Sequence, residues 1–365
     1  MKIKNLIVLL AACGLVFALE PAGSTVRNVI LCIGDGMGLA QVSAARIRVL
    51  GALGRLTMES MPITAVVTTC SADKLITDSG AAATALATGY KTRNGMIAVA
   101  PDNTKLRTIL EACQAKGLSA GLVATSSITH ATPAAFGSHS SSRGDEAGIA
   151  GQLLGNRIDV LLAGGRMFFL PDTITGSSRS DHRNLIDEAT AAGYQYLSNR
   201  RELDQATAGR FLGLFQTGEL TGDSLEPTLA EMTAAAIRTL RQDKDGFFLM
   251  VEGSQIDWGG HSNDIDAVIQ EVVQFDAAVK ACLEFASDDG HTLVVVTADH
   301  ETGGLSIIAG FLNGDSLRVG WQSTDHTATQ VPLYAYGPQA VRFTGTLDNT
   351  DIPKKIATIL GITGF

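Results

Sequence analysis

The sequence has no run of basic residues and few charged residues of either sign. Charged side chains make up 18% of its 365 residues, and the formal net charge is −9. Nucleic acids are bound mainly through clustered lysine and arginine, so this composition argues against a nucleic-acid-binding surface. Small anionic molecules are not excluded, because metal ions or single arginines can reverse the local field at a site.

The chain also lacks an apolar run long enough for a transmembrane helix. Leu6–Leu19 is apolar, but a membrane-spanning helix needs about 20 such residues. With its basic start, the segment 1–19 has the pattern of an export signal. Val16–Ala18 fits signal cleavage, whereas Leu10–Cys13 resembles a bacterial lipobox. We therefore expect an exported protein that is either periplasmic or anchored to the membrane through a lipid on Cys13.

The cysteines have no spacing typical of a metal knuckle. Cys32 falls in an apolar stretch, and Cys113 and Cys282 fall in helical patterns. We interpret them as small buried hydrophobic residues. The spacing leaves one disulfide open and does not predict it.

Short apolar runs rich in β-branched residues alternate with helical patterns along the chain. The expected strands are Val26–Ile33, Ile63–Thr69, Ala120–Thr125, Ile158–Ala163, Phe247–Val251, Thr292–Thr297 and Val331–Tyr336. The expected helices include Leu106–Lys116, Leu229–Arg241 and Ile265–Ala286. This alternation predicts an α/β fold with a doubly wound, mostly parallel sheet and helices on both faces. In such sheets, ligands bind beyond the carboxyl ends of the strands.

A glycine-rich stretch follows the first expected strand, but it lacks the last glycine of a dinucleotide fingerprint. Gly34–Gly38 is followed by Leu39 where that fingerprint requires glycine. The glycines let the backbone turn tightly around Asp35. This residue is therefore either a turn aspartate or a carboxylate ligand for a metal.

Potential metal ligands follow three further strands. Glu252 closes an apolar strand, which is costly unless the carboxylate is paired or bound to a cation. Asp257 and His261 are four residues apart, so a helical turn would bring them together. The other candidates are Asp299 and His300 after a strand, and His326 before the last expected strand. His130 and Thr132 follow a further strand and would share one face of an extended segment.

Taken together, these candidates could hold two or three metal ions. Mixed imidazole and carboxylate ligands suit zinc, whereas an oxygen-rich set suits magnesium.

The stretch Thr77–Thr84 begins an alanine-rich segment that favours a helix up to Gly89. Asp78 has the side chain of an N-cap residue. Ser79 then lies at the start of the helix, where free N–H groups and the helix dipole favour negative charge. By itself, this pattern is either ordinary helix-start chemistry or a nucleophile.

In combination, these motifs resemble those of the alkaline phosphatase family, in the family's order from about Val26 to Pro338. The matching motifs are Gly34–Gly38, Thr77–Ser79, His130–Ala135, Arg143, Val251–His261, Thr297–His300 and Asp325–Thr327. The resemblance implies one catalytic domain over residues 24–365, with a variable segment at about 166–226, and a homodimer.

The resemblance also implies a role for each site residue. Phosphate monoesters would be hydrolysed through a phosphoserine at Ser79, with Arg143 clamping the phosphoryl oxygens. Asp78 would cap the helix and help to hold Arg143 without binding metal. The implied ligands are Asp257, His261 and His326 for one zinc, Asp35, Asp299, His300 and Ser79 for a second zinc, and Asp35, Thr132 and Glu252 for a third ion, usually magnesium.

Two positions depart from the best-studied bacterial members, which carry aspartate where His130 stands and lysine where Trp258 stands. The pair His130 and Trp258 is similar to a subgroup of enzymes from marine and cold environments. Imidazole is a poorer partner than carboxylate for hydrated magnesium. The expected third ion is therefore either zinc or weakly held magnesium.

Three alternative functions stay open at this point. A sulfatase would need its nucleophile in a C/S-x-P-x-R context, but Gly80–Ala83 follows Ser79. A phosphodiesterase would not explain the presence of Arg143, because a diester has one fewer anionic oxygen for an arginine to hold. An exported phosphate- or metal-binding protein would need the ligands but no nucleophile.

Overall fold

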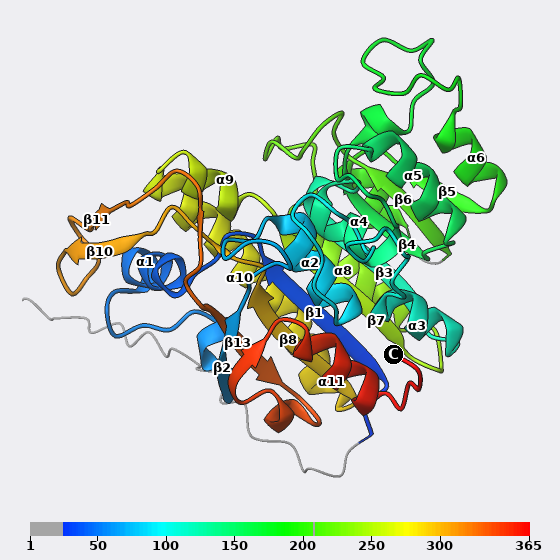
Figure 1. Cartoon of the computed structure of the whole chain (residues 1–365). Helices are drawn as coiled ribbons and strands as arrows, with labels where there is room; N and C mark the ends of the chain where they lie inside the picture. Colours follow the sequence, from blue (N-terminus) through cyan, green and yellow to red (C-terminus); the bar gives the residue numbers. More distant parts are fainter. Residues whose placement is uncertain (1–24, 207–208) are drawn as a thin grey trace, which may run out of the picture.

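The computed structural model describes residues 25–206 and 209–365, so the expected export signal and Cys13 lie outside the described residues. Ten of its strands form a single sheet (Figure 1). In sheet order they are β14 (Gly345–Asp348), β2 (Ile63–Thr68), β13 (Val331–Tyr336), β8 (Thr292–Ala298), β1 (Asn28–Gly34), β7 (Phe247–Gly253), β3 (Ser119–Ser127), β4 (Val160–Gly164), β6 (Arg210–Leu214) and β5 (Tyr194–Leu197).

Neighbouring strands pair in parallel except at β13, which is antiparallel to both β2 and β8. Every residue of β1, β7 and β8 is buried. Burial on both faces explains why these strands read as continuous apolar runs rather than as alternating ones. The structure therefore confirms the expected doubly wound, mostly parallel sheet.

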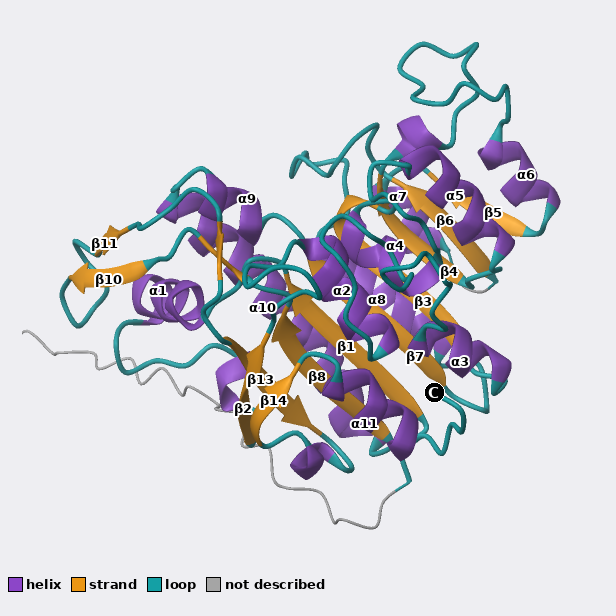
Figure 2. Cartoon of the chain, viewed as in Figure 1, coloured by secondary structure: helices purple, strands orange, loops and turns teal. Residues whose placement is uncertain are grey.

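Helices cover both faces of the sheet. Figure 2 shows α2, α4 and α11 in front of the sheet and α8 and α10 behind it. The helices are α1 (Leu39–Leu50), α2 (Ser79–Thr88), α3 (Ile109–Ala115), α4 (Ala131–Gly137), α5 (Glu146–Gly155), α6 (Leu185–Ala191), α7 (Arg200–Gln205), α8 (Leu229–Leu240), α9 (Ile256–His261), α10 (Ile265–Asp289) and α11 (Asp351–Ile359). None of the helices in the described part of the chain is long and apolar enough to cross a bilayer.

The helix expected from Leu106 begins later, at Ile109. Thr108 accepts a hydrogen bond from the backbone N–H of Glu111, and Glu111 in turn accepts one from the backbone N–H of Thr108. This reciprocal capping box satisfies the free N–H groups of the first turn and fixes the start of α3.

The carboxyl ends of the central strands meet at one edge of the sheet. Ile33 of β1 is paired with Glu252 of β7 on one side and with Thr297 of β8 on the other. The backbone N–H of Asp35 donates to the carbonyl of Gly253 at 3.1 Å. This register brings Asp35, Glu252 and the residues after β8 together.

Along the sequence, the segment between β8 and β13 forms two small antiparallel pairs of strands outside the main sheet. The first joins β9 (Glu301–Thr302) to β12 (His326–Thr327), with Thr302 opposite His326. The second joins β10 (Ser306–Ala309) to β11 (Arg318–Gly320) and projects from the body beside α1 (Figure 1). The segment 166–226 contributes β5 and β6 to the far edge of the sheet.

Candidate active site and metal centres

Ser79 is the first residue of α2 and is almost completely buried. Asp78 is the N-cap, as expected, because its Oδ1 accepts a hydrogen bond from the N–H of Ala81 at 2.9 Å. The Oγ of Ser79 lies 3.3 Å from Nε2 of His300. The start of α2 therefore points the hydroxyl at the residues that follow β8.

A first group of potential metal ligands comprises Asp257, His261 and His326. Asp257 and His261 lie on α9, one helical turn apart, as the sequence predicts. Nε2 of His261 lies 3.2 Å from Asp257 Oδ2 and 3.2 Å from Nε2 of His326. Because both imidazole nitrogens and the carboxylate face one point, the group suits a cation with nitrogen and oxygen ligands.

The far side of each imidazole in this group is held by a backbone carbonyl. Nδ1 of His261 lies 2.5 Å from the carbonyl oxygen of Thr324, and Nδ1 of His326 lies 2.9 Å from that of Thr77. A carbonyl can only accept, so Nδ1 carries the proton in both rings, as in most metal-binding histidines.

A second group comprises Asp35, Asp299 and His300, all fully buried. Nε2 of His300 lies 3.2 Å from Asp299 Oδ2 and 3.5 Å from Asp35 Oδ1. Together with the hydroxyl of Ser79, these atoms surround a second position where a cation could bind.

A third group comprises Asp35, His130 and Glu252, and the Oγ1 of Thr132 is also buried there. The structure corrects one expectation about this group. His130 and Thr132 do not lie on an extended segment, because His130 is the N-cap of α4 and Thr132 is its second residue. Pro133 is tolerated in the first turn of this helix, where an N–H has no intrahelical partner.

The second and third groups contain several buried polar atoms that have no hydrogen-bond partner. Among the described residues, the buried side-chain atoms that lack a hydrogen bond include Asp35 Oδ1 and Oδ2, Asp299 Oδ2, Glu252 Oε1, Thr132 Oγ1 and His130 Nδ1. Leaving one such atom unpaired costs about 1–3 kcal/mol. Because these atoms converge, the residues present fit bound cations.

The raised pKa values of the buried carboxyl groups also indicate that the site favours added positive charge. Burial raises the pKa of both Glu252 and Asp299 to about 7, and it raises the pKa of Asp35 well above its usual value. Burial lowers the pKa of His300 and His130 to about 4, so both imidazoles are neutral and can act as ligands.

Arg143 contacts Asp78, the residue before Ser79, and is held on two sides. One terminal nitrogen of its guanidinium donates to Asp78 Oδ2 at 3.0 Å, and the other lies 3.0 Å from Nε2 of His130. The side chain of Arg143 is 31% exposed, so the remaining N–H groups can reach a ligand. The ring of Trp258 meets that of His130 edge to face, with centroids 6.3 Å apart.

Sequence reasoning missed three residues that support the ligands. The hydroxyl of Thr302 donates to Asp257. Behind it, Gln41 donates to Glu301 at 2.7 Å and to the carbonyl of Thr302 at 2.8 Å. The only signal for Glu301 and Thr302 was their place directly after His300, and Gln41 gave no signal.

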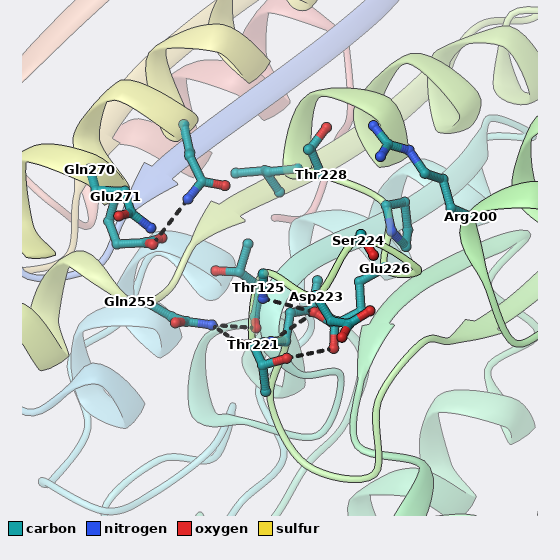
Figure 3. Close-up of a pocket in the computed structure, with 15 residues that line it drawn as sticks. Thr125, Arg200, Thr221, Asp223, Ser224, Glu226, Thr228, Gln255, Gln270 and Glu271 are labelled. Atoms are coloured by element: carbon teal, nitrogen blue, oxygen red, sulfur yellow. Dashed lines mark hydrogen bonds between the residues drawn. The ribbon is translucent and has the colours of Figure 1, made fainter.

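A separate polar cavity of about 210 Å³ lies near the third group and is shown in Figure 3. Its lining includes Thr125, Glu226, Gln255 and Glu271, but neither Ser79 nor any of the grouped ligands. Gln255 donates to the carbonyl of Thr125 at 3.1 Å. The cavity is therefore adjacent to the site without being part of it.

Comparison with known proteins identifies the family. The alkaline phosphatase family model matches residues 26–316 and 313–362. The chain is similar to alkaline phosphatase 3 of Bacillus subtilis, with 38% identity over 418 aligned positions covering 91% of this chain and 88% of the relative. It is also similar to the alkaline phosphatase of Escherichia coli, with 33% identity covering 92% of this chain and 86% of the relative.

Solved structures agree with this assignment. Alkaline phosphatase from the Antarctic bacterium TAB5 superposes with a TM-score of 0.85 at 34% identity, covering 93% of this chain and 99% of that one. A cold-active alkaline phosphatase from a psychrophilic Shewanella species gives a TM-score of 0.82 at 31% identity, covering 91% and 99%. The chain therefore belongs to the alkaline phosphatase family, as its motifs suggest, and is an enzyme that hydrolyses phosphate monoesters.

Proposed function

We propose that Ser79 is the nucleophile of this phosphatase and becomes a phosphoserine during turnover. The observation that carries the proposal is the position of its hydroxyl at the N-terminus of α2, 3.3 Å from His300. The helix terminus favours the negative charge that develops on the oxygen and, later, on the phosphoryl group.

Arg143 is proposed to bind the phosphoryl group. A guanidinium carries five N–H donors, of which Asp78 engages one. Nε2 of His130 lies 3.0 Å from another guanidinium nitrogen, but it carries the ring proton when Nδ1 binds an ion and then accepts no hydrogen bond. The remaining donors can hold two phosphoryl oxygens at once, which orients the phosphorus for in-line attack by Ser79. Because the transition state of phosphoryl transfer is loose, positioning and charge neutralisation supply most of the rate.

The ligand groups are proposed to hold two zinc ions and a third ion. Asp257, His261 and His326 would hold the first zinc. Asp35, Asp299, His300 and Ser79 would surround the second. When bound, these cations would lower the pKa of the Ser79 hydroxyl and neutralise charge on the leaving-group oxygen.

For the third ion, Asp35, Thr132 and Glu252 are proposed as ligands, joined by Nδ1 of His130. That nitrogen is buried and has no hydrogen-bond partner. An imidazole ligand favours zinc over magnesium. A histidine-to-aspartate variant of the TAB5 enzyme has magnesium bound in a site called M3, which supports a third ion site in this family.

Further parts of the proposal concern the whole protein. We propose a single catalytic domain over residues 24–365, with 166–226 as its variable segment. We also propose export to the periplasm, or anchoring through a lipid on Cys13, and assembly as a homodimer. Exposed apolar side chains just after α1 and in the β10–β11 loop, among them Leu53 and Leu312, are proposed as the surface for a second copy.

The test combines metal analysis with three substrates. The purified protein is assayed with an aryl phosphate, a bis-aryl phosphate and an aryl sulfate, and its zinc and magnesium contents are measured. We expect the aryl phosphate to be the best substrate, a chelator to abolish the activity, and zinc with magnesium to restore it. A chelated protein with unchanged activity would refute the proposed metal centres.

A further inference from the structure

Thr302 lies between the two proposed zinc groups without belonging to either. It is the second residue of β9 and is fully buried. Its hydroxyl donates to Oδ1 of Asp257, a residue of the first group. The same oxygen lies 3.3 Å from Nδ1 of His300, a residue of the second group. One hydroxyl therefore contacts ligands of both groups.

The direction of these hydrogen bonds follows from the orientation of His300. Its Nε2 faces Ser79, Asp299 and Asp35, at 3.3, 3.2 and 3.5 Å. In the tautomer that can ligate through Nε2, the proton is on Nδ1. Nδ1 then donates to Thr302, and the hydroxyl proton of Thr302 goes to Asp257. Two consecutive hydrogen bonds therefore connect His300, a ligand of the second group, to Asp257, a ligand of the first.

The arrangement at His300 differs from that at the other two histidines. His261 and His326 are oriented by backbone carbonyls, those of Thr324 and Thr77. A backbone carbonyl cannot pass the hydrogen bond on, whereas a hydroxyl is both acceptor and donor. Among the histidines of the two proposed zinc groups, His300 is thus the one whose orientation depends on a replaceable side chain.

The position of Thr302 is fixed by several backbone contacts. Its N–H donates to the carbonyl of Gly36 at 3.3 Å, and its carbonyl accepts from Gln41 at 2.8 Å. Thr302 also pairs with His326 across the β9–β12 ladder. Gly36 has a φ of 71°, and a Cβ there would lie 2.8 Å from the hydroxyl oxygen of Thr302. The glycine leaves room for the hydroxyl.

We propose that Thr302 is a positioning residue that orients His300 and Asp257 together and so couples the two zinc sites. This inference rests on the zinc ligation proposed above. It implies that loss of one hydroxyl weakens both sites at once, although Thr302 itself does not bind metal.

The test measures zinc affinity directly. Metal-free parent protein and the variants Thr302→Val, Thr302→Ala and Thr302→Ser are titrated with zinc in competition with a chromogenic chelator at fixed pH. Removing a residue that supports a ligand typically lowers metal affinity about 10- to 100-fold. We expect a loss of this size at both sites in the valine and alanine variants, and parental affinities in the serine variant.

Thr233→Val is the matched control. Thr233 is fully buried in α8, and its hydroxyl donates only within that helix, to the carbonyl of Leu229 at 2.8 Å. This control should bind zinc as the parent does. Thermal unfolding of each metal-free protein checks folding, and the alanine variant keeps the test decisive if the valine variant does not fold.

Three results would overturn the inference: parental affinity at both sites without the hydroxyl, a loss confined to one site, or an equal loss in Thr233→Val. Failure of the parent to bind zinc would instead refute the proposed metal centres. The two failures are therefore distinguishable.

Discussion

Replacing Arg143 with lysine tests the phosphoryl clamp most sharply. Arginine reaches Asp78 and His130 through different nitrogens, both at 3.0 Å, and it still has free donors on each for two phosphoryl oxygens. Lysine carries its three donors on one nitrogen and lacks the planar fork, so it cannot keep the Asp78 contact and also hold both oxygens side by side. The variant should lose about one charge-assisted hydrogen bond in the transition state.

The expected loss follows from the energy of that bond. A hydrogen bond to a charged group contributes about 1.5–3 kcal/mol. Since each 1.36 kcal/mol is about tenfold in rate, kcat/KM for an aryl phosphate should fall about 10- to 150-fold in Arg143→Lys. The loss of affinity for inorganic phosphate, measured as a competitive inhibitor, should be smaller if the clamp acts mainly in the transition state.

A remote arginine provides the control. Arg210 donates to Asp159 at 3.2 Å near the far edge of the sheet, so Arg210→Lys should leave kcat/KM unchanged. A value for Arg143→Lys equal to that of the parent would refute the assignment of Arg143 as the clamp. An equal fall in both variants would do the same, because it would reflect a general effect of the substitution.

Other expected outcomes test the nucleophile, the third ion and a structural ion pair. Ser79→Ala should lower turnover by several orders of magnitude while most of the zinc, measured by elemental analysis, stays bound; full activity would exclude this nucleophile. His130→Asp should shift the third site from zinc towards magnesium after dialysis against both ions, and an unchanged metal content would contradict direct ligation by His130. Burial acts to lower the pKa of His139, but hydrogen bonds to Glu111 and Ala98 outweigh it and raise the pKa. The pair therefore stabilises the fold fully below about pH 6.5 and loses this contribution as pH rises through the raised pKa. His139→Gln should lower the unfolding temperature more at pH 6 than at pH 9, and an equal effect at both would show that protonation plays no part.

The sequence predicts the central strands well because β1, β7 and β8 are buried on both faces. It does not predict β5, β6 and β14, which lie at or next to the two edges of the sheet. β13 has the expected bounds, Val331–Tyr336. β7 runs two residues further than its apolar pattern, to Gly253. The extension depends on pairing between Gly253 and Gly34 of a distant strand, and no local pattern can show such pairing.

The site residues were predictable to the extent that they carry distinctive chemistry at strand ends. Aspartate, glutamate and histidine after apolar runs are visible in a sequence because they are costly to bury without partners. Thr302 is different, since a buried threonine in a short strand is unremarkable by residue type. Its role depends on the position of one hydroxyl between two ligands, and that position is visible only in the folded structure.

The spread of the ligands along the chain has a consequence for the order of folding. The first group joins α9 to a residue of β12, and the second joins Asp35, just after the first strand, to residues after β8. Contacts of such high sequence separation form late and slowly, because the entropy of closing long loops must be overcome first. A partly synthesised chain that ends before His326 has an incomplete first group. Metal uptake should therefore follow the completion of the sheet, and the bound ions would report that nearly the whole chain has reached its native topology.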